Sequence, residues 1–332
     1  MASRAQQVAR AGENTRGADD PRREGAARMG ALENRRHIAT AVRALRPQQW
    51  VKNLLLFVPL ILAHAFADGA RLGATALAFG CFCLCASATY VWNDLFDVEA
   101  DRQHPRKRER PLASGALSIR AGIAWSVAVL AIGLGLSAAL LPAASTAMLA
   151  VYVAITTAYS AWLKQQLYID VLVLAGLYTH RVLAGGVAAD VTVSPWLLLF
   201  SMFFFLSLAF VKRYAELLAA QSRDPGDQQQ QLARRGYQVG DISLVETMGL
   251  ASGYLAVLVI GLYVNSDEVR RYYPTPELLW LMCPVLLYWI TRIWFLARRG
   301  ILPDDPVLFA ATDRNSYLAG ALVAAIGIAA SA

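Results

Sequence analysis

The sequence predicts an all-α, polytopic membrane protein built as a bundle of transmembrane helices. Of its 332 residues, 57% are hydrophobic and only 17% are charged, and the mean hydropathy is +0.41. That composition is too apolar for a soluble domain of this size. Apolar runs of about 20 residues, enough to cross a hydrocarbon core of roughly 30 Å, recur along the chain. Two long polar loops interrupt these runs.

We expect a polar tail followed by a single transmembrane domain over residues 37–332. Residues 1–36 are rich in Arg, Gly and Ala, a composition that predicts a disordered cytoplasmic tail rather than a cleavable signal sequence. The long polar loops are 93–119 and 213–243. The expected transmembrane helices number nine and cover residues 52–69, 72–92, 120–141, 143–162, 168–188, 194–212, 244–265, 277–297 and 315–331.

The distribution of lysine and arginine predicts the orientation of the bundle. These residues are concentrated before the first span and in both long loops, whereas the opposite side carries only Arg71, Arg270 and Arg271. Positively charged loops stay on the inner side, so we expect a cytoplasmic N-terminus and cytoplasmic long loops in the inner membrane. The net charge of +7 is spread between apolar segments and does not indicate nucleic-acid binding.

The four cysteines do not indicate a disulfide framework or a metal site. Cys81, Cys83 and Cys85 alternate within one apolar run, and Cys283 lies in another. Alternate residues of a helix point to different sides, so this spacing makes a poor metal cage. We predict that all four pack in the protein interior.

The strongest local signal is the acidic segment that directly follows the second apolar run. If the helix continues through it, Asn93, Asp97 and Asp101 recur every four residues along one face, with Asp94 next to Asp97. Several carboxylates on one face repel each other and favour a bound cation. Oxygen ligands select a hard ion, and Mg²⁺ links one or two carboxylates to substrate phosphates. The alternative is a solvated helix end whose acids pair with nearby arginines.

Further candidate residues lie in the loop after this segment and at the same ends of other predicted helices. Arg181 follows His180 inside an apolar run, where an ionisable pair indicates either a functional site or a salt bridge within the bundle. Lys52 also suits an anchor at the membrane interface, and the loop cations also suit topology signals. The candidate catalytic residues are Asp94, Asp97 and Asp101, and the candidate metal ligands are Asn93, Asp94, Asp97 and Asp101. The candidate substrate-binding residues are Lys52, Asn53, Lys107, Arg110, Tyr159, Lys164, Arg181, Lys212, Arg213 and Glu216.

From Arg46 to its end, the sequence resembles the UbiA superfamily of intramembrane polyprenyl transferases. The resemblance rests on Asn93-Asp94-x-x-Asp97-x-x-x-Asp101 after the second of nine predicted helices. It implies a helical bundle around a central cavity, a lipid chain in a lateral apolar tunnel, and a Mg²⁺-diphosphate bound by two aspartate-rich motifs. The first of those motifs carries over to these four residues.

The second motif departs from the pattern of the superfamily. Most members place Asp-x-x-x-Asp after the sixth helix, whereas this chain reads Lys-Arg-Tyr-Ala-Glu over residues 212–216. One acid remains and two cations are added. A second metal held by two aspartates is therefore not supported, and the added positive charge suits a substrate with a phosphate beyond its diphosphate.

Segments 46–53, 101–111 and 212–216 are similar to one branch of the superfamily, the decaprenyl-phosphate phosphoribosyltransferases. That branch implies transfer of a 5-phosphoribosyl group from phosphoribosyl diphosphate to a polyprenyl phosphate, with release of diphosphate, in the synthesis of cell-envelope polysaccharide precursors. Two other functions stay open. A prenyltransferase that moves a polyprenyl group to an aromatic acceptor needs the same first motif, and a transporter or lipid-binding protein would line a path with midmembrane polar residues.

Overall fold

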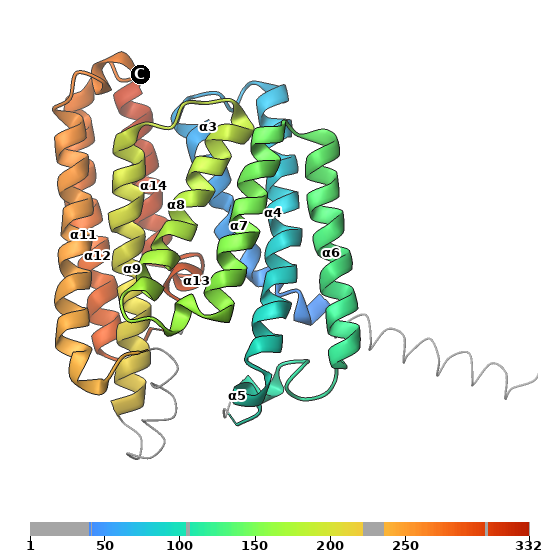
Figure 1. Cartoon of the computed structure of the whole chain (residues 1–332). Coiled ribbons are helices and arrows are strands. Elements are labelled where there is room, and N and C mark those ends of the chain that lie inside the picture. The colour runs from blue at the N-terminus through green and yellow to red at the C-terminus, as the bar shows by residue number, and fades with distance from the viewer. Residues whose placement is uncertain (1–39, 41, 104–106, 222–235, 303–304, 332) are drawn as a thin grey trace, which may run out of the picture.

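The computed structural model describes residues 40, 42–103, 107–221, 236–302 and 305–331, and these form helices and turns without a strand. The expected tail over residues 1–36 lies outside this part. The main helices run roughly along one axis and alternate in direction (Figure 1). In chain order the elements are η1 (Pro47–Phe57), α3 (Val58–Leu62), α4 (Gly69–Phe96), α5 (Val98–Gln103), η2 (Lys107–Glu109), α6 (Ile119–Leu140), α7 (Ala143–Ala161), η3 (Leu163–Gln165), α8 (Ile169–Ala189), α9 (Pro195–Gln221), η4 (Val239–Asp241), α11 (Ile242–Val264), η5 (Val269–Arg271), η6 (Pro276–Leu281), α12 (Met282–Arg298), α13 (Pro306–Ala310) and α14 (Arg314–Ser331).

Seven helices in the described ranges are long and apolar enough to cross a membrane, which confirms a multi-pass membrane protein. These are α4, α6, α7, α8 and α9, α11 together with η4, and α12 together with η6. The prediction of nine transmembrane helices is not confirmed, because the first and last expected spans are not among the seven. The last, α14, begins with the polar residues Arg314, Asn315 and Ser316. The expected central cavity and the division into tail and domain stay predictions.

The first expected span is built differently from the others. Eleven residues form the 3-10 helix η1, and five more form α3. A 3-10 helix rises about 2.0 Å per residue and an α-helix about 1.5 Å, so the two elements together extend about 30 Å. Sixteen residues therefore cover a distance for which an α-helix needs about 20. The 3-10 form has a period of three residues, which directs Trp50, Asn53 and Leu56 to one side.

A glycine on α8 allows the backbone of η1 to approach closely. A Cβ atom added at Gly185 would lie 2.1 Å from the carbonyl oxygen of Leu56. Any larger side chain would push η1 away from α8. Small residues at helix interfaces are typical of membrane bundles because they let backbones come together. This contact sets the position of Lys52 and Asn53, which lie on η1 one turn before Leu56.

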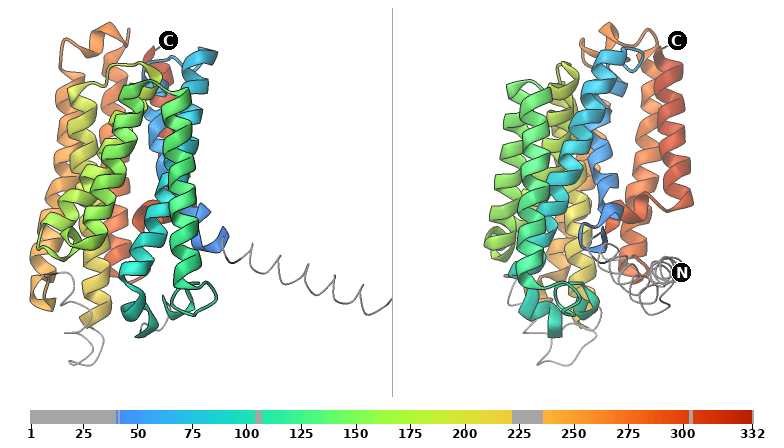
Figure 2. Two further views of the ribbon diagram at one scale, coloured as in Figure 1. Left: turned by 45° about the vertical axis from the view of Figure 1, so that its right-hand side comes forward. Right: turned by 90° about the vertical axis from the view of Figure 1, so that its right-hand side faces the viewer.

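Two buried apolar clusters hold the remaining helices. One lies around α9, α11 and α12, where the ring of Trp294 fills the space beside Gly249. The other joins α4, α6, α7 and α8 and contains Cys81 and Cys85. The cysteine prediction is confirmed: all four cysteines are free, three are buried, and the fourth, Cys283, packs against the first cluster. Figure 2 shows these two groups of helices side by side in two further views.

Candidate functional site

The acidic segment lies where α4 passes into α5, and we call this end of the bundle the acidic end. Although α4 ends at Phe96, Asp97 N donates to Asn93 O at 3.0 Å and Asp101 N donates to Asp97 O at 2.8 Å, so the helical path continues. Residues four or seven apart lie on one side of a helix, whereas neighbours are turned by about 100°. The polar residues therefore form two rows, Asn93 with Asp97 and Asp94 with Asp101.

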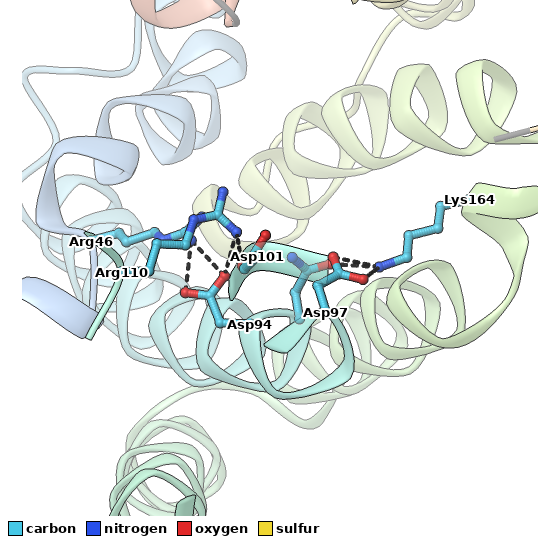
Figure 3. Close-up of polar contacts among 7 residues, drawn as sticks. Arg46, Asp94, Asp97, Asp101, Arg110 and Lys164 are labelled. Carbon is cyan, nitrogen blue, oxygen red and sulfur yellow. Dashed lines mark hydrogen bonds and ion pairs between the residues drawn. The ribbon is translucent and has the colours of Figure 1, made fainter. Parts of the chain in front are cut away.

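The row of Asp94 and Asp101 is bound by two arginines. Arg46 Nη2 donates to both carboxylate oxygens of Asp94, at 2.6 and 2.7 Å. Arg110 Nη1 bridges the row, at 3.0 Å from Asp94 Oδ1 and 2.6 Å from Asp101 Oδ2. Arg46 has a left-handed backbone with φ 51°, a conformation that residues other than glycine rarely adopt. Figure 3 shows both guanidinium groups converging on Asp94.

The second row faces a lysine from another part of the bundle. Lys164, on η3, directs its Nζ atom at both oxygens of Asp97, at 2.7 and 2.8 Å, and at Asn93 Oδ1, at 3.3 Å. Figure 3 shows this contact on the side of the helix away from the arginines. The sequence alternative in which the acids pair with nearby arginines therefore describes Asp94 and Asp101, while Asp97 pairs with Lys164.

The four expected metal ligands do not form one cluster in the described structure. Over the residues that the structure describes, no group of three or more His, Cys, Asp or Glu side chains is arranged to hold a metal ion. The donor set nevertheless suits Mg²⁺, because it consists of carboxylate and amide oxygens. Arg110 Nη1 touches both Asp94 and Asp101 and stands where a cation bridging these acids would lie. Lys164 holds the equivalent place beside Asn93 and Asp97.

A second polar group lies further inside the bundle, and we call Lys52, Tyr152, Tyr178 and Arg181 the inner basic cluster. The Arg181 guanidinium lies 5.5 Å from the ring centroid of Tyr178 and 4.7 Å from that of Tyr152, and Lys52 Nζ lies 5.9 Å from that of Tyr178. Arg181 donates to Tyr152 Oη at 2.9 Å and to Asn53 Oδ1 at 2.9 Å. Two cations that the sequence separates by more than a hundred residues therefore share one tyrosine.

Asp305, which is not among the candidates predicted from the sequence, connects this cluster to the start of α13. One of its carboxylate oxygens caps α13 by accepting from Val307 N at 3.1 Å and Leu308 N at 3.2 Å, and the other pairs with Lys52. Burial acts to raise the pKa of Asp305, but the charges of Lys52 and Lys212 and the bonds to its carboxylate outweigh it, so the pKa lies below its usual value. The group is therefore an anion at neutral pH.

Arg213 belongs to a sealed network of Asp170, Arg213 and Tyr237, which also contacts Glu216. Its guanidinium pairs with Asp170 and with Glu216. Tyr237 Oη donates to Asp170 Oδ1 at 2.8 Å, and burial together with the Asp170 charge raises the pKa of Tyr237. Asp170 and Arg213 are both fully enclosed. These two charges are already satisfied by each other, so Arg213 has a structural role in this arrangement.

The remaining candidates lie at the acidic end but in less defined positions. Tyr159 is half-buried near the end of α7, and Lys212 is half-buried on α9 beside Asp305. Lys107 is half-buried at the start of η2. All three lie on elements that reach the acidic end.

Asp170 and Arg46 are likewise absent from the candidate residues that the sequence predicts. Asp170 stands inside an apolar run, and an acid at that depth is a signal for a paired charge. Arg46 was noted within segment 46–53 without a role. Asp305 carried only the signal of an acid before proline, which is typical of a helix N-cap. Nothing local pointed to its contact with Lys52.

The fold and the site together define an intramembrane helical protein whose polar groups gather at one end of the bundle and extend inward. The sequence profile of the UbiA prenyltransferase family matches residues 54–225. The chain therefore belongs to the UbiA prenyltransferase family, as its acidic motif indicated. A UbiA homologue from Archaeoglobus fulgidus solved with GPP and Mg²⁺ has the same fold, with a TM-score of 0.66 at 16% identity, over 88% of this chain and 99% of that one.

Three relatives show how far the similarity extends. Nodulation protein NoeC of Azorhizobium caulinodans is 38% identical over 87% of this chain and 91% of its own length. The uncharacterized protein y4nM of Sinorhizobium fredii is 39% identical over 84% of this chain, which spans only 54% of that relative. The decaprenyl-phosphate phosphoribosyltransferase of Corynebacterium glutamicum is 41% identical over 53% of this chain and 54% of its own length.

Proposed function

We propose that this protein transfers a 5-phosphoribosyl group from phosphoribosyl diphosphate to a polyprenyl phosphate such as decaprenyl phosphate, and releases diphosphate. The first support is the similarity to the phosphoribosyltransferase of Corynebacterium glutamicum, which covers about half of each chain. We further propose that the acidic end faces the cytoplasm from the inner membrane, where phosphoribosyl diphosphate is available. The product would serve the synthesis of cell-envelope polysaccharide precursors.

The observation that carries the proposal is the excess of cations over acids around the site. Among the described residues of the site, the acids are Asp94, Asp97, Asp101 and Asp305. The cations are Arg46, Lys52, Arg110, Lys164, Arg181 and Lys212. A prenyl diphosphate presents one diphosphate group, whereas this substrate pair adds a 5-phosphate and a lipid phosphate. Lysine and arginine side chains bind phosphate oxygens through charge-assisted hydrogen bonds, so the additional cations suit these two additional phosphates.

The acidic segment would hold Mg²⁺ through Asp94, Asp97, Asp101 and the amide oxygen of Asn93. Bound there, Mg²⁺ supplies neutralisation of the diphosphate and of the charge that develops on it as it leaves. A cation held there would replace the contacts that Arg110 makes with Asp94 and Asp101 and that Lys164 makes with Asp97. Arg110 and Lys164 would then be able to donate to phosphate oxygens, so the same exchange would expose the metal ligands and supply two anion ligands.

The proposed reaction breaks the bond between the anomeric carbon and the diphosphate oxygen and forms a bond from that carbon to an oxygen of the lipid phosphate. The electron pair of the broken bond leaves with diphosphate. The acceptor oxygen is already anionic, so no side chain has to remove a proton. The protein therefore acts mainly by aligning the two substrates and by stabilising negative charge with fixed cations.

Labelled substrate tests the proposal directly. Purified protein in detergent would receive labelled phosphoribosyl diphosphate, Mg²⁺ and decaprenyl phosphate, and label would be counted in the organic phase. Label in the lipid, dependent on both decaprenyl phosphate and Mg²⁺, is the expected result. The absence of labelled lipid from protein that transfers a prenyl group to an aromatic acceptor would overturn the proposal.

The second candidate is prenyl transfer from a polyprenyl diphosphate to an aromatic or other acceptor. Family membership favours it, and so does the similar fold of the Archaeoglobus fulgidus homologue solved with GPP and Mg²⁺. It would use the same acidic segment. Lys212 and the cations of the inner basic cluster have no evident task in it.

A further inference from the structure

We infer that the inner basic cluster is a second anion site, separate from the acidic end, that binds a phosphate monoester through Arg181 and Lys52. This inference rests on the proposed function for the identity of the ligand. It rests on the charges and contacts of the cluster itself for the existence of the site.

The cluster lies well inside the bundle. Asn53 connects Arg181 to α4, because its amide oxygen accepts from Arg181 Nε and its amide nitrogen donates to Cys83 Sγ at 3.3 Å. Cys83 precedes Asp94 on α4 by eleven residues, which corresponds to about 16 Å along a helix. The part of the cluster around Asn53 and Arg181 therefore lies about three helical turns from Asp94.

Arg181 is a buried cation with neutral partners. Its guanidinium donates to Asn53 Oδ1, to Tyr152 Oη and, at 2.7 Å, to the carbonyl oxygen of Leu177. Among the side chains that the structure describes, no carboxylate lies within ion-pair distance of it, and the residue is only 5% exposed. Burying a charge without a counter-ion is costly, and more so inside a membrane. Neutral dipoles and aromatic faces offset part of that cost, and an anion would offset more.

Among the described residues, Asp305 is the acid that pairs with this cluster, and it does not cancel the cluster's charge. Asp305 pairs with Lys52, so Lys52, Arg181 and Asp305 together leave one net positive charge. Tyrosine hydroxyls in the cluster are able to donate to an anion, and a guanidinium matches two phosphate oxygens at once. A phosphate monoester has the charge and the acceptor oxygens that this combination requires.

A path of alternating cations and tyrosines leads from the acidic end to the cluster. Arg46, which binds Asp94, lies 5.6 Å from the ring centroid of Tyr90. Lys52 and Arg181 follow at the ring of Tyr178. Under the proposed function, the diphosphate lies at the acidic end. The inner site then takes either the 5-phosphate of the donor or the phosphate of the lipid acceptor, and these are chemically the same group.

Binding measurements on the full-length protein in detergent test the inference without turnover. Three probes would be titrated: farnesyl phosphate, ribose 5-phosphate, and pyrophosphate with Mg²⁺. Arg181→Gln should weaken binding of at least one monoester tenfold or more and leave pyrophosphate binding unchanged. Arg181→Lys should retain part of the affinity, and Arg120→Gln, which changes an exposed arginine on α6, should behave as wild type.

The two monoesters identify the source of the phosphate. If Arg181→Gln loses affinity only for farnesyl phosphate, the site binds the phosphate of the lipid acceptor. If it loses affinity only for ribose 5-phosphate, the site binds the 5-phosphate of the donor. Equal affinity of wild type and Arg181→Gln for both monoesters overturns the inference. Monoester binding through Arg181 in a protein that forms no phosphoribosyl lipid would refute the proposed function and retain the site.

A second variant covers the case in which Arg181→Gln also loses pyrophosphate binding, the sign of a folding defect. Lys52→Gln combined with Asp305→Asn removes a cation together with its paired acid, so neither charge of that pair is left behind. This double variant should show the same selective loss of monoester binding. If the double variant binds both monoesters as tightly as wild type does, Lys52 has no role in the site. If Arg181→Gln is also misfolded, that result overturns the whole inference.

Discussion

The acidic end and the sealed network are both built from aspartate–arginine pairs, yet they differ in what surrounds the arginines. The side chain of Arg46 is 18% exposed and that of Arg110 is 25% exposed, whereas that of Arg213 is 1% exposed. Asp170 has no exposed surface at all. The arginines of the acidic end reach solvent and can exchange partners. The arginine of the sealed network cannot move without leaving a buried charge unpaired.

This difference separates two roles that look identical in sequence. Removing one partner of a buried pair is strongly destabilising, because the other charge stays behind without compensation. A pair at the rim of a site costs far less to open, since water and incoming ions replace the lost partner. We therefore expect changes at the acidic end to affect chemistry and changes in the sealed network to affect folding.

The largest effect is expected from Asp97→Ala. The change removes the acid of the second row, and transfer should fall by about a thousandfold or more, the scale of losing one group that stabilises transition-state charge. Thermal unfolding in detergent should stay close to that of wild type. Glu99→Ala is the matched control, because Glu99 lies two residues away with a side chain that is 74% exposed. Substantial activity in Asp97→Ala would remove its proposed metal role.

Asp170→Asn should mainly cost stability. It leaves Arg213 charged and buried, which corresponds to a loss of about 3–5 kcal/mol. Chemical denaturation in detergent measures this, with Asp190→Asn at the exposed far end of α8 as the control. A stable Asp170→Asn protein that loses phosphate binding would instead support Arg213 as a substrate ligand.

Arg110→Gln should change how the protein binds metal. If Arg110 stands in the place of a bridging ion, its removal should raise the affinity for Mg²⁺ by about tenfold, the equivalent of one charge-assisted hydrogen bond of about 1.5 kcal/mol. Titration with Mg²⁺ in the absence of substrate is the measurement. Arg102→Gln, which removes an exposed arginine paired only with Glu99 among the described contacts, is the control. Unchanged or weaker Mg²⁺ binding would contradict the exchange.

The smallest effect concerns pH and Asp305. Because its pKa is lowered, the pair with Lys52 contributes stability that is fully present above the ordinary carboxyl pKa of about 3.9 and is lost only as pH falls through the lower folded value. The stability difference between wild type and Asp305→Asn should therefore stay constant from pH 7 to about pH 5. A difference that disappears over that interval would show that the pair is not formed.

Much of the fold and part of the site follow from local patterns. The long helices were predicted from hydropathy, and the acids of residues 93–101 from their position after the second apolar run. The pairing of those acids was not predicted as it is, because the spacing suggested one face with one ion. The helix instead presents two rows, and each meets a different cation. The same substrate-binding role was predicted for Lys212 and Arg213, because nothing near residues 212–216 indicates which of the two side chains is buried.

The sequence by itself determined the class of protein, the seven long apolar helices and the location of the acids, because apolar length and helical period are properties of neighbouring residues. Tertiary structure alone decided which charge meets which. Arg213 reaches Asp170 across 43 positions and Lys52 reaches Asp305 across 253. Such contacts depend on how each helix is rotated and how closely it packs, as Gly185 shows for η1 and α8. Whether a charge is held as structure or kept available for substrate follows from that packing.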